Sequence, residues 1–358
     1  MEPLNVWDYE ALAAEHLEPG AHGYYAGGAG DEQTLRDNVE AYRRWILRPR
    51  MLIDVEGCTT ATTVLGQEIS MPLLVAPVAF QRVAHRDGEV GMARAALGAY
   101  TIVCYSTLAT STPAEVAATG AKRWFQLYVL RDEGVTHELI AQARECGFGA
   151  LVLTIDAPVR GNRERDLRTA FTVPPDLPVA SFRRGGITPR EVFDMISPSL
   201  TWPDLERIAG EAKLPLLVKG VLTAEDARLA CEHGAAGIVV SNHGGRQLDG
   251  VAATIDALPE VVEAVDGRLE VLVDGGIRRG GDVVKALALG ARAVLAGRAP
   301  LWGLVVGGEA GARHVLELLR EEIRLSLQLA GCTSPADVTR GHVSRRLVQT
   351  AGPTTLEG

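Results

Sequence analysis

Short apolar runs that alternate with longer amphipathic stretches limit the fold of this chain more than any other feature. The runs are four to six residues long, rich in branched side chains and bounded by glycine, proline or polar residues, as buried β-strands are. Eight such strands are predicted, at Pro72–Ala76, Thr101–Tyr105, Trp124–Tyr128, Ala150–Ile155, Pro215–Val218, Gly237–Val240, Glu270–Val273 and Ala293–Ala296.

Eight strand and helix units without a long-range sequence repeat indicate an α/β fold, a (β/α)8 or TIM barrel. No Ser/Pro-rich linker divides the chain, so we expect residues 1–358 to form a single domain, with the barrel core at about residues 72–345. Helical patterns lie between most of the strands, for example at Pro113–Thr119, His137–Cys146, Ala224–His233 and Gly281–Leu289.

About 70 residues precede the first predicted strand and are expected to form a helical N-terminal extension. Helices are predicted at Trp7–His16 and near Asp31–Tyr42. Two extended segments, Ile46–Val55 and Thr60–Ile69, are expected to plug the bottom of the barrel. The Pro-rich, weakly periodic segment Pro174–Leu200 follows the fourth strand. A barrel carries its lids on such loops, so we predict a lid there.

Composition argues against several classes of partner and site. The net charge of −9 and the pI near 5.5 disfavour nucleic acid or an anionic membrane as a partner. No apolar run approaches the roughly 18 residues that span a bilayer, and the N-terminus lacks the basic and apolar regions of a secretion signal. The five cysteines lie far apart, which favours reduced thiols in the cytoplasm over disulfides or a metal site.

Polar or glycine-containing segments follow the predicted strands. The carboxyl ends of barrel strands converge on one face, where such enzymes place their active sites. Scattered surface residues would not gather at the same end of eight strands. The residues expected to meet at this face are Ala76, Pro77, Val78, Ser106, Gln126, Tyr128, Thr154, Asp156, Lys219, Ser241, His243, Asp274, Gly275, Gly276, Arg278, Gly297 and Arg298.

The nonapeptide Ser-Asn-His-Gly-Gly-Arg-Gln-Leu-Asp, which begins at Ser241, is the most informative motif. It places His243 and Arg246 at the end of a core strand, and the two glycines between them let the backbone approach a flat ligand. A histidine beside an arginine suits the removal of a proton from a substrate whose carboxylate the arginine holds. Taken alone, the motif also fits a tight turn with a capping histidine and a solvated arginine.

Two turns with glycine and arginine follow the seventh and eighth strands, where barrels commonly bind phosphate through backbone N–H groups and a helix N-terminus. They contain Gly275, Gly276 and Arg278, and then Gly297 and Arg298. The alternative is two ordinary turns with surface arginines. The presence of both turns at the two expected positions favours phosphate.

Several further polar residues have two interpretations each. Lys219 either extends to solvent or faces a ring that becomes anionic on reduction. Asp156 either caps the following turn or pairs with His243. Tyr24, in a glycine-rich segment before the barrel, belongs to a packed aromatic corner or approaches a ligand, and Arg163 belongs to an exposed ion-pair run or binds the substrate carboxylate. Ser106, Gln126 and Thr154 fit either hydrogen bonds to a ring's heteroatoms or satisfied core positions.

With these residues, the chain resembles the FMN-dependent L-2-hydroxy acid oxidase and dehydrogenase family, which includes glycolate oxidase, lactate oxidase, lactate monooxygenase and mandelate dehydrogenase. The resemblance runs nearly end to end, and the Ser-Asn-His-Gly-Gly-Arg-Gln sequence is its most specific part. Its other parts are Tyr24-Tyr25-Ala26, Ala76-Pro77, Phe125-Gln126-Leu127-Tyr128, Lys219-Gly220, Asp274-Gly275-Gly276 and Gly297-Arg298.

The resemblance implies a role for each candidate residue. His243 would be the base, paired with Asp156, and Tyr128 would contact the substrate hydroxyl or keto oxygen. Tyr24, Arg163 and Arg246 would hold the substrate carboxylate. Lys219 would lie by the N1 edge of FMN. The other residues of the cofactor site would be Ala76, Pro77, Val78, Ser106, Gln126, Thr154 and Ser241 along the flavin, Asp274 at the ribityl chain, and Gly275, Gly276, Arg278, Gly297 and Arg298 at the phosphate.

The resemblance also implies the reaction, the oxidation of an L-2-hydroxy acid to a 2-oxo acid with O2 reduced to H2O2. L-lactate is the first choice of substrate, because Leu108 offers an apolar wall where some members carry an aromatic residue, and the loop after the fourth strand is closest to lactate oxidase. Ala79 stands where some dehydrogenases have glycine, which favours oxygen as acceptor. The alternatives are glycolate or mandelate-type acids with another acceptor, or lactate monooxygenase. A homotetramer is expected.

Two other classes of protein fit less well. A related nucleotide barrel such as inosinate dehydrogenase needs a catalytic cysteine after the sixth strand, but the nearest cysteine, Cys231, precedes that strand. A barrel kept only as a binding or scaffold module would not be expected to carry His243, Arg246, Asp156 and Lys219 together.

Overall fold

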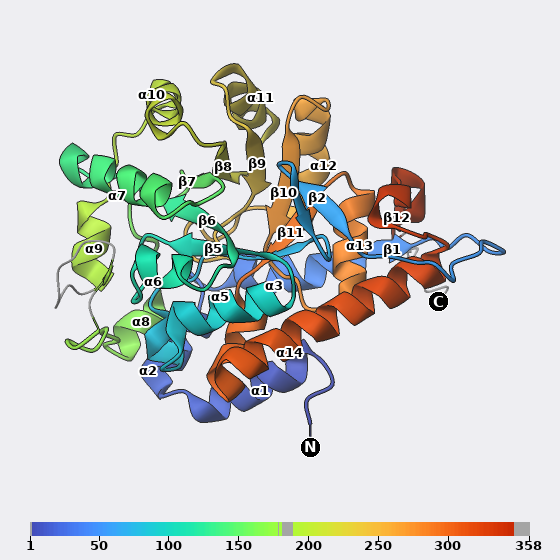
Figure 1. Ribbon diagram of the computed structural model, residues 1–358, viewed down its shortest axis with the longest axis horizontal. Coiled ribbons are helices and arrows are strands. Elements are labelled where there is room, and N and C mark those ends of the chain that lie inside the picture. Colours follow the sequence, from blue (N-terminus) through green and yellow to red (C-terminus); the bar gives the residue numbers. More distant parts are fainter. Residues whose placement is uncertain (1, 178, 181–188, 347–358) are drawn as a thin grey trace, which may run out of the picture.

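Eight parallel strands form a closed barrel in the computed structural model, which describes residues 2–177, 179–180 and 189–346. The strands follow one another in chain order, and the last pairs with the first to close the barrel. The predicted (β/α)8 barrel is confirmed (Figure 1). Its strands are β4 (Leu73–Val75), β5 (Ile102–Ser106), β6 (Lys122–Leu127), β7 (Leu151–Thr154), β8 (Leu216–Val221), β9 (Gly237–Val240), β10 (Glu270–Asp274) and β11 (Ala293–Ala296).

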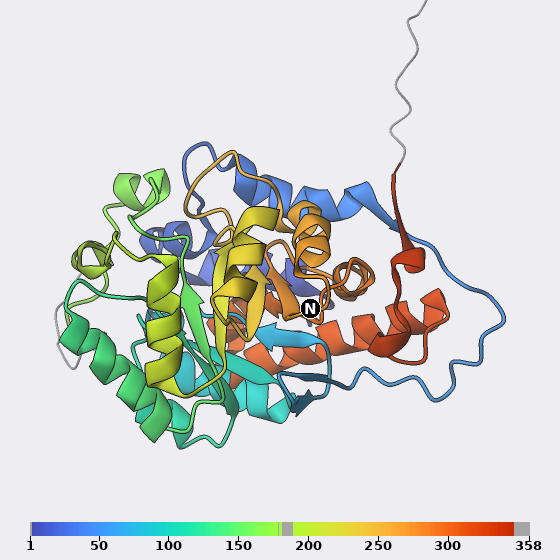
Figure 2. The same ribbon diagram turned by 90° about the horizontal axis from the view of Figure 1, so that it is seen from above.

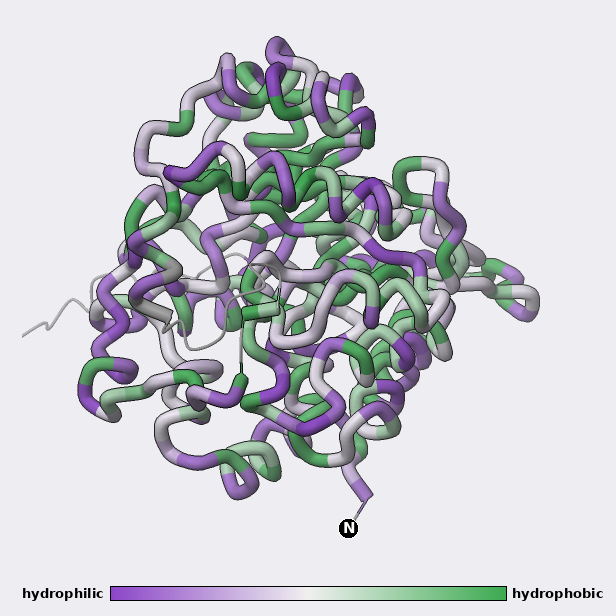
Figure 3. Tube along the Cα trace, turned by 60° about the vertical axis from the view of Figure 1, so that its left-hand side comes forward, coloured by the Kyte–Doolittle hydropathy of each residue, from purple (hydrophilic) through white to green (hydrophobic). Residues whose placement is uncertain are grey.

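Both faces of the barrel wall are buried, which explains why its strands are continuous apolar runs rather than alternating ones. Successive side chains point to opposite faces of a strand. Leu217 and Val239 therefore pack inside the barrel, whereas Val218 and Ile238 pack outward among the helices. In Figure 3 the hydrophobic part of the trace gathers at the centre of the molecule. The prediction of the strands succeeded because each one has two apolar faces.

A hairpin closes the amino-terminal end of the barrel. It consists of β2 (Thr62–Val64) and β3 (Gln67–Ile69), and its Val64 and Ile69 are buried within the interior apolar cluster. The Leu65 N–H donates to Glu270 Oε2 at 2.8 Å, which attaches the hairpin to β10. The prediction that Thr60–Ile69 plugs the barrel is thus confirmed.

The other predicted plug, Ile46–Val55, is wrong. Its first residues belong to β1 (Trp45–Leu47), which pairs antiparallel with β12 (Val343–Arg345), and the following residues lie exposed on the surface. The charges of Arg48, Arg50 and Asp54 explain this outcome, since burial of unpaired charges in a dry barrel end is costly.

Helices surround the barrel and precede it (Figure 1). The predicted helices before the barrel are present, and α2 was not predicted. These early helices are α1 (Val6–His16), α2 (Pro19–Ala26), α3 (Gln33–Glu40) and the 3-10 turn η1 (Ala41–Arg44). The remaining helices are α4 (Gln81–Ala84), α5 (Gly88–Gly98), α6 (Pro113–Ala117), α7 (Glu133–Glu145), α8 (Glu164–Arg168), α9 (Pro189–Met195), α10 (Trp202–Ala212), α11 (Ala224–Glu232), α12 (Thr254–Val265), α13 (Gly280–Ala288), α14 (Arg298–Ala330), η3 (Pro335–Asp337) and η4 (Arg340–His342).

The predicted lid lies between β7 and α10. Residues 178 and 181–188 of Pro174–Leu200 lie outside the described residues. The part that follows them contains α9, which backbone hydrogen bonds attach to the end of β6. The Arg131 N–H donates to Met195 O at 2.8 Å, and the Ser197 N–H donates to Val129 O at 2.9 Å.

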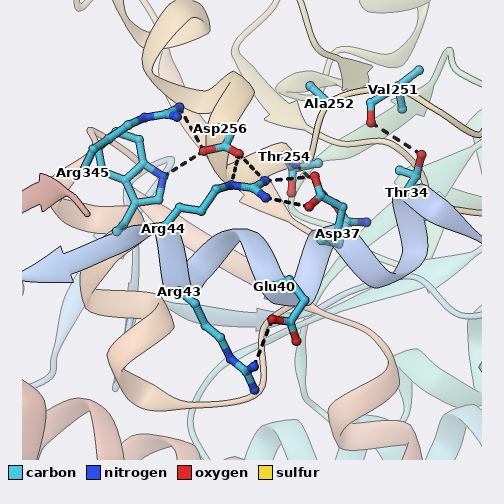
Figure 4. Close-up of polar contacts among 12 residues, drawn as sticks. Thr34, Asp37, Glu40, Arg43, Arg44, Val251, Ala252, Thr254, Asp256 and Arg345 are labelled. Atoms are coloured by element: carbon cyan, nitrogen blue, oxygen red, sulfur yellow. Dashed lines mark hydrogen bonds and ion pairs between the residues drawn. The ribbon is translucent and has the colours of Figure 1, made fainter. Parts of the chain in front are cut away.

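An ion-pair network joins the N-terminal extension to the barrel helices (Figure 4). Arg44 bridges two carboxylates, with Nη1 2.7 Å from Asp37 Oδ1 and Nε 2.9 Å from Asp256 Oδ2. The other oxygen of Asp256 accepts from Trp45 Nε1 at 3.0 Å and from Arg345 Nη2 at 3.1 Å. Asp256 on α12 therefore holds η1, β1 and β12 together.

Replacement of Asp256 by alanine should lower the free energy of unfolding by about 1–3 kcal/mol, because the Trp45 N–H and one side of the Arg44 guanidinium lose their acceptor. The matched control is Glu40→Ala, which removes an exposed ion pair with Arg43 at 3.0 Å and should change stability by less than about 0.5 kcal/mol. Urea unfolding followed by circular dichroism measures both values. Equal effects of the two substitutions would contradict the role of Asp256.

Candidate active site

A ring of mostly polar residues lies inside the barrel, next to its apolar layer on the carboxyl-terminal side. Side chains two apart on a strand point the same way, so the residue two positions after each interior apolar residue also faces inward. Leu217 is followed in this way by Lys219, and Leu272 by Asp274. On the other strands Ala76, Ser106, Gln126, Thr154, Ser241 and Gly297 stand two positions after Leu74, Cys104, Trp124, Val152, Val239 and Leu295.

A cavity opens above this ring and contains about 1010 Å³ of space, counting the part that is open to solvent. This is the upper end of the roughly 300–1,000 Å³ range of small-molecule and cofactor sites. The predicted residues that line it are Tyr24, Ala76, Pro77, Val78, Ser106, Leu108, Gln126, Tyr128, Thr154, Arg163, Lys219, His243, Arg246, Asp274, Gly275, Gly276, Arg278, Gly297 and Arg298. The other two, Asp156 and Ser241, contact lining residues from behind.

His243 is held in one orientation and tautomer. Its Nδ1 lies 2.7 Å from Asp156 Oδ1, so the proton of the neutral ring sits on Nδ1 and Nε2 is free to accept. Nε2 faces the cavity beside the Tyr128 hydroxyl at 3.3 Å. The His243 backbone is left-handed, with φ of 59°, and the Ser241 hydroxyl accepts from its N–H at 3.1 Å. A non-glycine residue in this conformation is strained and typical of functional sites.

The surroundings keep this imidazole neutral at physiological pH. Burial lowers the pKa of His243, and the positive charge of Lys219 adds to this effect, although Asp156 opposes it. Burial alone would raise the pKa of Asp156, but the electrostatic interactions with His243 and Lys219, together with the hydrogen bond from His243, outweigh it and hold that pKa below its usual value. Burial and the charge of Asp156 raise the pKa of Tyr128, so this phenol keeps its proton and donates. The arrangement is a neutral base beside a neutral donor.

Two arginines, Arg163 buried and Arg246 half-buried, face the same part of the cavity. The guanidinium of Arg246 lies 4.7 Å from the centre of the Tyr24 ring, and its Nη1 donates to the carbonyl oxygens of Tyr24 and Gly27. Arg163 donates to Arg246 O at 3.1 Å and is only 3% exposed. Burial and the neighbouring charge of Arg246 lower the pKa of Arg163 to about 10. Neither guanidinium has a carboxylate within ion-pair distance in the described chain, so the pair favours an anionic ligand.

Arg298 has a structural role as well as a place on the cavity wall. Its three nitrogens donate to the carbonyl oxygens of Tyr25, Gly27 and Gly244 at 2.9–3.0 Å, which ties the N-terminal extension to the loop after β9. Burial, together with the charges of Arg246 and Arg278, lowers the pKa of Arg298 to about 9. The other N–H groups of Arg298 are available for the predicted contact with a phosphate.

A chain of polar contacts crosses the barrel floor from strand to strand. Gln126 Nε2 donates to Thr154 Oγ1 at 3.0 Å, and the Ser106 hydroxyl lies 3.4 Å from Gln126 Oε1. Lys219 Nζ donates to Ser241 Oγ at 2.8 Å and lies 3.4 Å from Asp274 Oδ2. Burial opposes the charge of Lys219, but the carboxylates of Asp274 and Asp156 outweigh it and raise its pKa. A fully charged ammonium thus lies on the cavity floor.

The turns after β10 and β11 form the far end of the cavity. Gly275 and Gly276 have φ of 93° and 77°, and a Cβ at Gly276 would lie 1.9 Å from the carbonyl oxygen of Asn38. The packing against α3 therefore requires glycine at position 276, independently of any ligand bound by the turn. Arg278 is held by Glu10 of α1, with Nε 3.0 Å from Glu10 Oε2.

These residues suit a phosphate-bearing, polar cofactor. Asp274 Oδ1 is buried and has no hydrogen-bond partner among the residues that the structure describes, as expected for an atom that accepts from a ligand hydroxyl. Lys219, Arg278 and Arg298 supply positive charge along the same wall.

Within the described ranges, no group of three or more His, Cys, Asp or Glu residues is arranged to hold a metal ion. Separately, no helix in those ranges is long and apolar enough to cross a membrane.

Three elements of the site were missed by sequence reasoning. Both polar atoms of the Gln247 side-chain amide form hydrogen bonds. Nε2 donates to the carbonyl oxygens of Asp156 and Val159, both at 2.9 Å. Oε1 accepts from Gly161 N at 3.1 Å and from Arg163 Nη2 at 3.2 Å. It thereby links the loops after β7 and β9. Its place in the nonapeptide was a usable signal.

The other missed elements lie on distant segments. Phe193 of α9 lines the cavity, with its ring centre 5.0 Å from the Arg163 guanidinium. Asn38 of α3 exchanges two 2.8 Å hydrogen bonds with the amide of Asn242, which fixes the loop that carries His243. No local sequence pattern indicates either contact.

A barrel whose mouth joins a neutral histidine with an accepting nitrogen, two arginines without a carboxylate partner among the described residues, and a glycine-rich turn is suited to oxidoreduction of an acid with a phosphate-bearing cofactor. The family of FMN-dependent dehydrogenases matches residues 13–345. The chain belongs to this family, and FMN is its cofactor.

Similar proteins cover the chain almost completely. The L-lactate oxidase of Nostoc sp. (strain PCC 7120 / SAG 25.82 / UTEX 2576) is 49% identical over 352 residues, 94% of this chain and 96% of that protein. Glycolate oxidase 5 of Oryza sativa subsp. japonica is 50% identical over 353 residues, 96% of each. The solved structure of a mandelate oxidase with (S)-4-hydroxymandelic acid has a TM-score of 0.91 and 42% identity, and covers 97% of this chain and 100% of that one.

The rate of flavin reduction by substrate should fall as the pH drops through the pKa of His243, which lies below the usual 6.5 of histidine. The sign follows from the base role, because the imidazole accepts a proton only in its neutral form. Asp156→Asn should shift this pH profile further down, since the Asp156 charge raises the pKa of His243. Anaerobic stopped-flow measurements across pH test both statements. An identical profile in the variant would exclude the Asp156–His243 coupling.

Proposed function

We propose that this protein oxidises a small aliphatic L-2-hydroxy acid, with L-lactate as the first choice, to the 2-oxo acid. Two electrons and two protons leave the substrate, and O2 takes them up as H2O2. The observation that carries the proposal is the juxtaposition of an accepting His243 Nε2, a donating Tyr128 hydroxyl 3.3 Å away, and two arginines, Arg163 and Arg246, on the wall of the same cavity.

The substrate carboxylate is assigned to Arg246 and Arg163, with Tyr24 beside them. A planar guanidinium matches a carboxylate with two parallel N–H donors, and both side chains line the cavity. Tyr128 is assigned to the substrate hydroxyl, which becomes the keto oxygen, because its phenol retains its proton and faces His243.

His243 is assigned the proton transfer. Its Nε2 takes a proton from the hydroxyl or from the α-carbon of the substrate, and Asp156 stabilises the imidazolium that results. The α-hydrogen leaves as a proton in one route and as a hydride in the other, and both routes need this base.

The cofactor is assigned to the cavity floor and its far end. When bound, FMN supplies a two-electron acceptor that passes its electrons to O2. Lys219 would place positive charge beside a ring that becomes anionic, and Asp274 Oδ1 would accept from the ribityl hydroxyls. Ala76, Pro77, Val78, Ser106, Gln126, Thr154 and Ser241 would line the ring, and Gly275, Gly276, Arg278, Gly297 and Arg298 would surround the phosphate.

A small substrate is favoured by the walls of the cavity. Leu108 is apolar and buried, and Phe193 stands 6.3 Å from the Tyr128 ring, centre to centre. The similar proteins bear the names of lactate, glycolate and mandelate oxidases, so the acid is decided by small differences in the pocket.

Ala79 on the same wall supports oxygen as the acceptor. We further propose one domain, a cytoplasmic location and a homotetramer.

Arg246→Lys should lower kcat/KM for the acid although the charge is kept, because lysine lacks the two parallel donors. The loss of a hydrogen bond to a charged group costs about 1.5–3 kcal/mol, which corresponds to a roughly 10- to 150-fold fall in kcat/KM. Arg165→Lys is the matched control, since Arg165 forms a surface ion pair with Glu32. Steady-state kinetics with both variants decide the assignment, and an unchanged kcat/KM for Arg246→Lys would refute it.

The substrate ranking should be L-lactate first, with glycolate and L-mandelate behind it. One methylene in an apolar pocket changes selectivity by about 1–3 kcal/mol, so the order is measurable. The test compares kcat/KM for the three acids under air and measures H2O2 directly. A preference for mandelate of more than roughly tenfold, about 1.4 kcal/mol, would overturn the small-substrate proposal. Flavin reduction without peroxide would identify a dehydrogenase or a monooxygenase instead.

A further inference from the structure

Glu89, in the first turn of α5, is a buried carboxylate outside the cavity. It is only 3% exposed and forms no ion pair within the residues that the structure describes. The neighbouring Arg82 pairs with the exposed Glu115 instead, at 3.3 Å. Burial of a carboxylate is costly unless other groups compensate its charge, so the surroundings of Glu89 must provide this compensation.

Five donors from two loops converge on this carboxylate. Oε1 accepts from the Gln81 N–H at 3.0 Å and from the Thr110 N–H at 2.9 Å. Oε2 accepts from the Thr110 hydroxyl at 2.8 Å, the Ser111 N–H at 3.0 Å and the Ser111 hydroxyl at 2.9 Å. The first donor belongs to the β4 loop, residues 76–81, and the others to the β5 loop, residues 107–111. Glu89 thus joins the loops after two paired barrel strands, and its place at a helix start favours the negative charge.

The helix that carries Glu89 is anchored in the core. Met92, Ala93, Ala95 and Ala96 of α5 are buried, and the helix packs against α14 (Figure 1). Figure 2 shows α14, the long orange-to-red helix, from above. Glu89 therefore fixes the β4 and β5 loops against the outer helices and not only against each other.

In both loops a cavity-lining residue lies two positions before a residue that Glu89 binds. Ala79 precedes Gln81 in this way, and Leu108 precedes Thr110. The loops also contact each other directly, because the Phe80 N–H donates to Leu108 O at 3.0 Å. Phe80 has a left-handed backbone, with φ of 56°. A strained conformation of this kind persists only where its surroundings hold it, so this part of the wall depends on the contacts behind it.

We propose that Glu89 is a positioning residue that sets where Leu108 and Ala79 stand on the cavity wall, and thereby which acids the cavity accepts. The inference rests on the function proposed above, in which Leu108 faces the substrate. A buried polar network whose members are all satisfied fixes one arrangement of its groups, whereas an apolar side chain at position 89 would leave both loops without these bonds. Small shifts of the wall matter, because one methylene in an apolar pocket changes selectivity by roughly 10- to 200-fold.

Glu89→Gln tests the proposal in the FMN-bound protein. The substitution keeps the size of the side chain but replaces one acceptor oxygen by an NH2 group, which then faces at least two of the five donors. The ratio of kcat/KM for L-lactate to that for L-mandelate should fall by at least roughly tenfold, the lower end of the effect of one methylene. Glu115→Gln is the matched control, because Glu115 connects α6 to Arg82 of α4 from the solvent side. It should leave the ratio unchanged.

A double-mutant cycle shows whether Glu89 acts through Leu108. In a Leu108→Ala background, Glu89→Gln should change the selectivity ratio by less than roughly twofold, since the side chain that it positions is gone. An effect as large as in the wild-type background would overturn the proposal, and so would an unchanged ratio in Glu89→Gln itself. The visible flavin spectrum confirms that each variant retains FMN.

Hydrogen–deuterium exchange measures the positioning without turnover. Peptides that cover the β4 and β5 loops should exchange faster in Glu89→Gln than in the wild type, and Glu115→Gln should not show this change. Failure of every acid to reduce the flavin would refute the proposed function, whereas unchanged exchange in these peptides would refute the role of Glu89. If Glu89→Gln does not fold, Ser111→Ala removes a single donor from Oε2, and the same two measurements should change in the same direction.

Discussion

The two-residue period of the barrel strands is the constraint on which the rest of the structure depends. Each strand directs alternate side chains inward, and the interior has room for an apolar layer followed by one polar layer. Leu217 and Leu272 belong to the first layer, and Lys219 and Asp274 to the second. Burial of these charges is tolerable because they lie 3.4 Å apart and compensate each other. A one-residue shift of register would place the same charges among the outer helices.

The loop after β9, which carries the proposed base His243, also connects distant parts of the structure. Asn242 pairs with Asn38, Gln247 spans to the loop after β7, and Asp249 accepts from the Thr34 N–H at the start of α3 at 2.8 Å. Gly245 leaves no room for a side chain, because its Cβ would lie 2.6 Å from the Leu35 nitrogen. The strained backbone of His243 is therefore held from both sides, by the N-terminal extension and by the barrel.

The fold and most of the cavity could be predicted from the sequence because both follow from local patterns. A buried strand is apolar on both faces, and the residues at its carboxyl end, such as Lys219 and Ser241, identify the cavity. What could not be predicted depends on contacts between distant segments. Arg298 binds carbonyl oxygens of the extension, Phe193 reaches the cavity from α9, and the Ile46–Val55 segment lies outside the barrel because its charges oppose burial.

The cavity carries more positive charge than its own carboxylates neutralise, and this excess determines which ligands the site can bind. The pKa values of Arg163 and Arg298 are lowered mainly by burial and then by the charge of Arg246, so the charged forms of these two guanidinium groups are destabilised until an anion enters. A single anion cannot neutralise the whole wall, because Arg278 lies at the glycine-rich end and Arg163 beside Phe193. Two anions in separate places, the proposed cofactor phosphate and the proposed substrate carboxylate, would satisfy the site. The accepting nitrogen of His243 then faces the remaining space next to Tyr128.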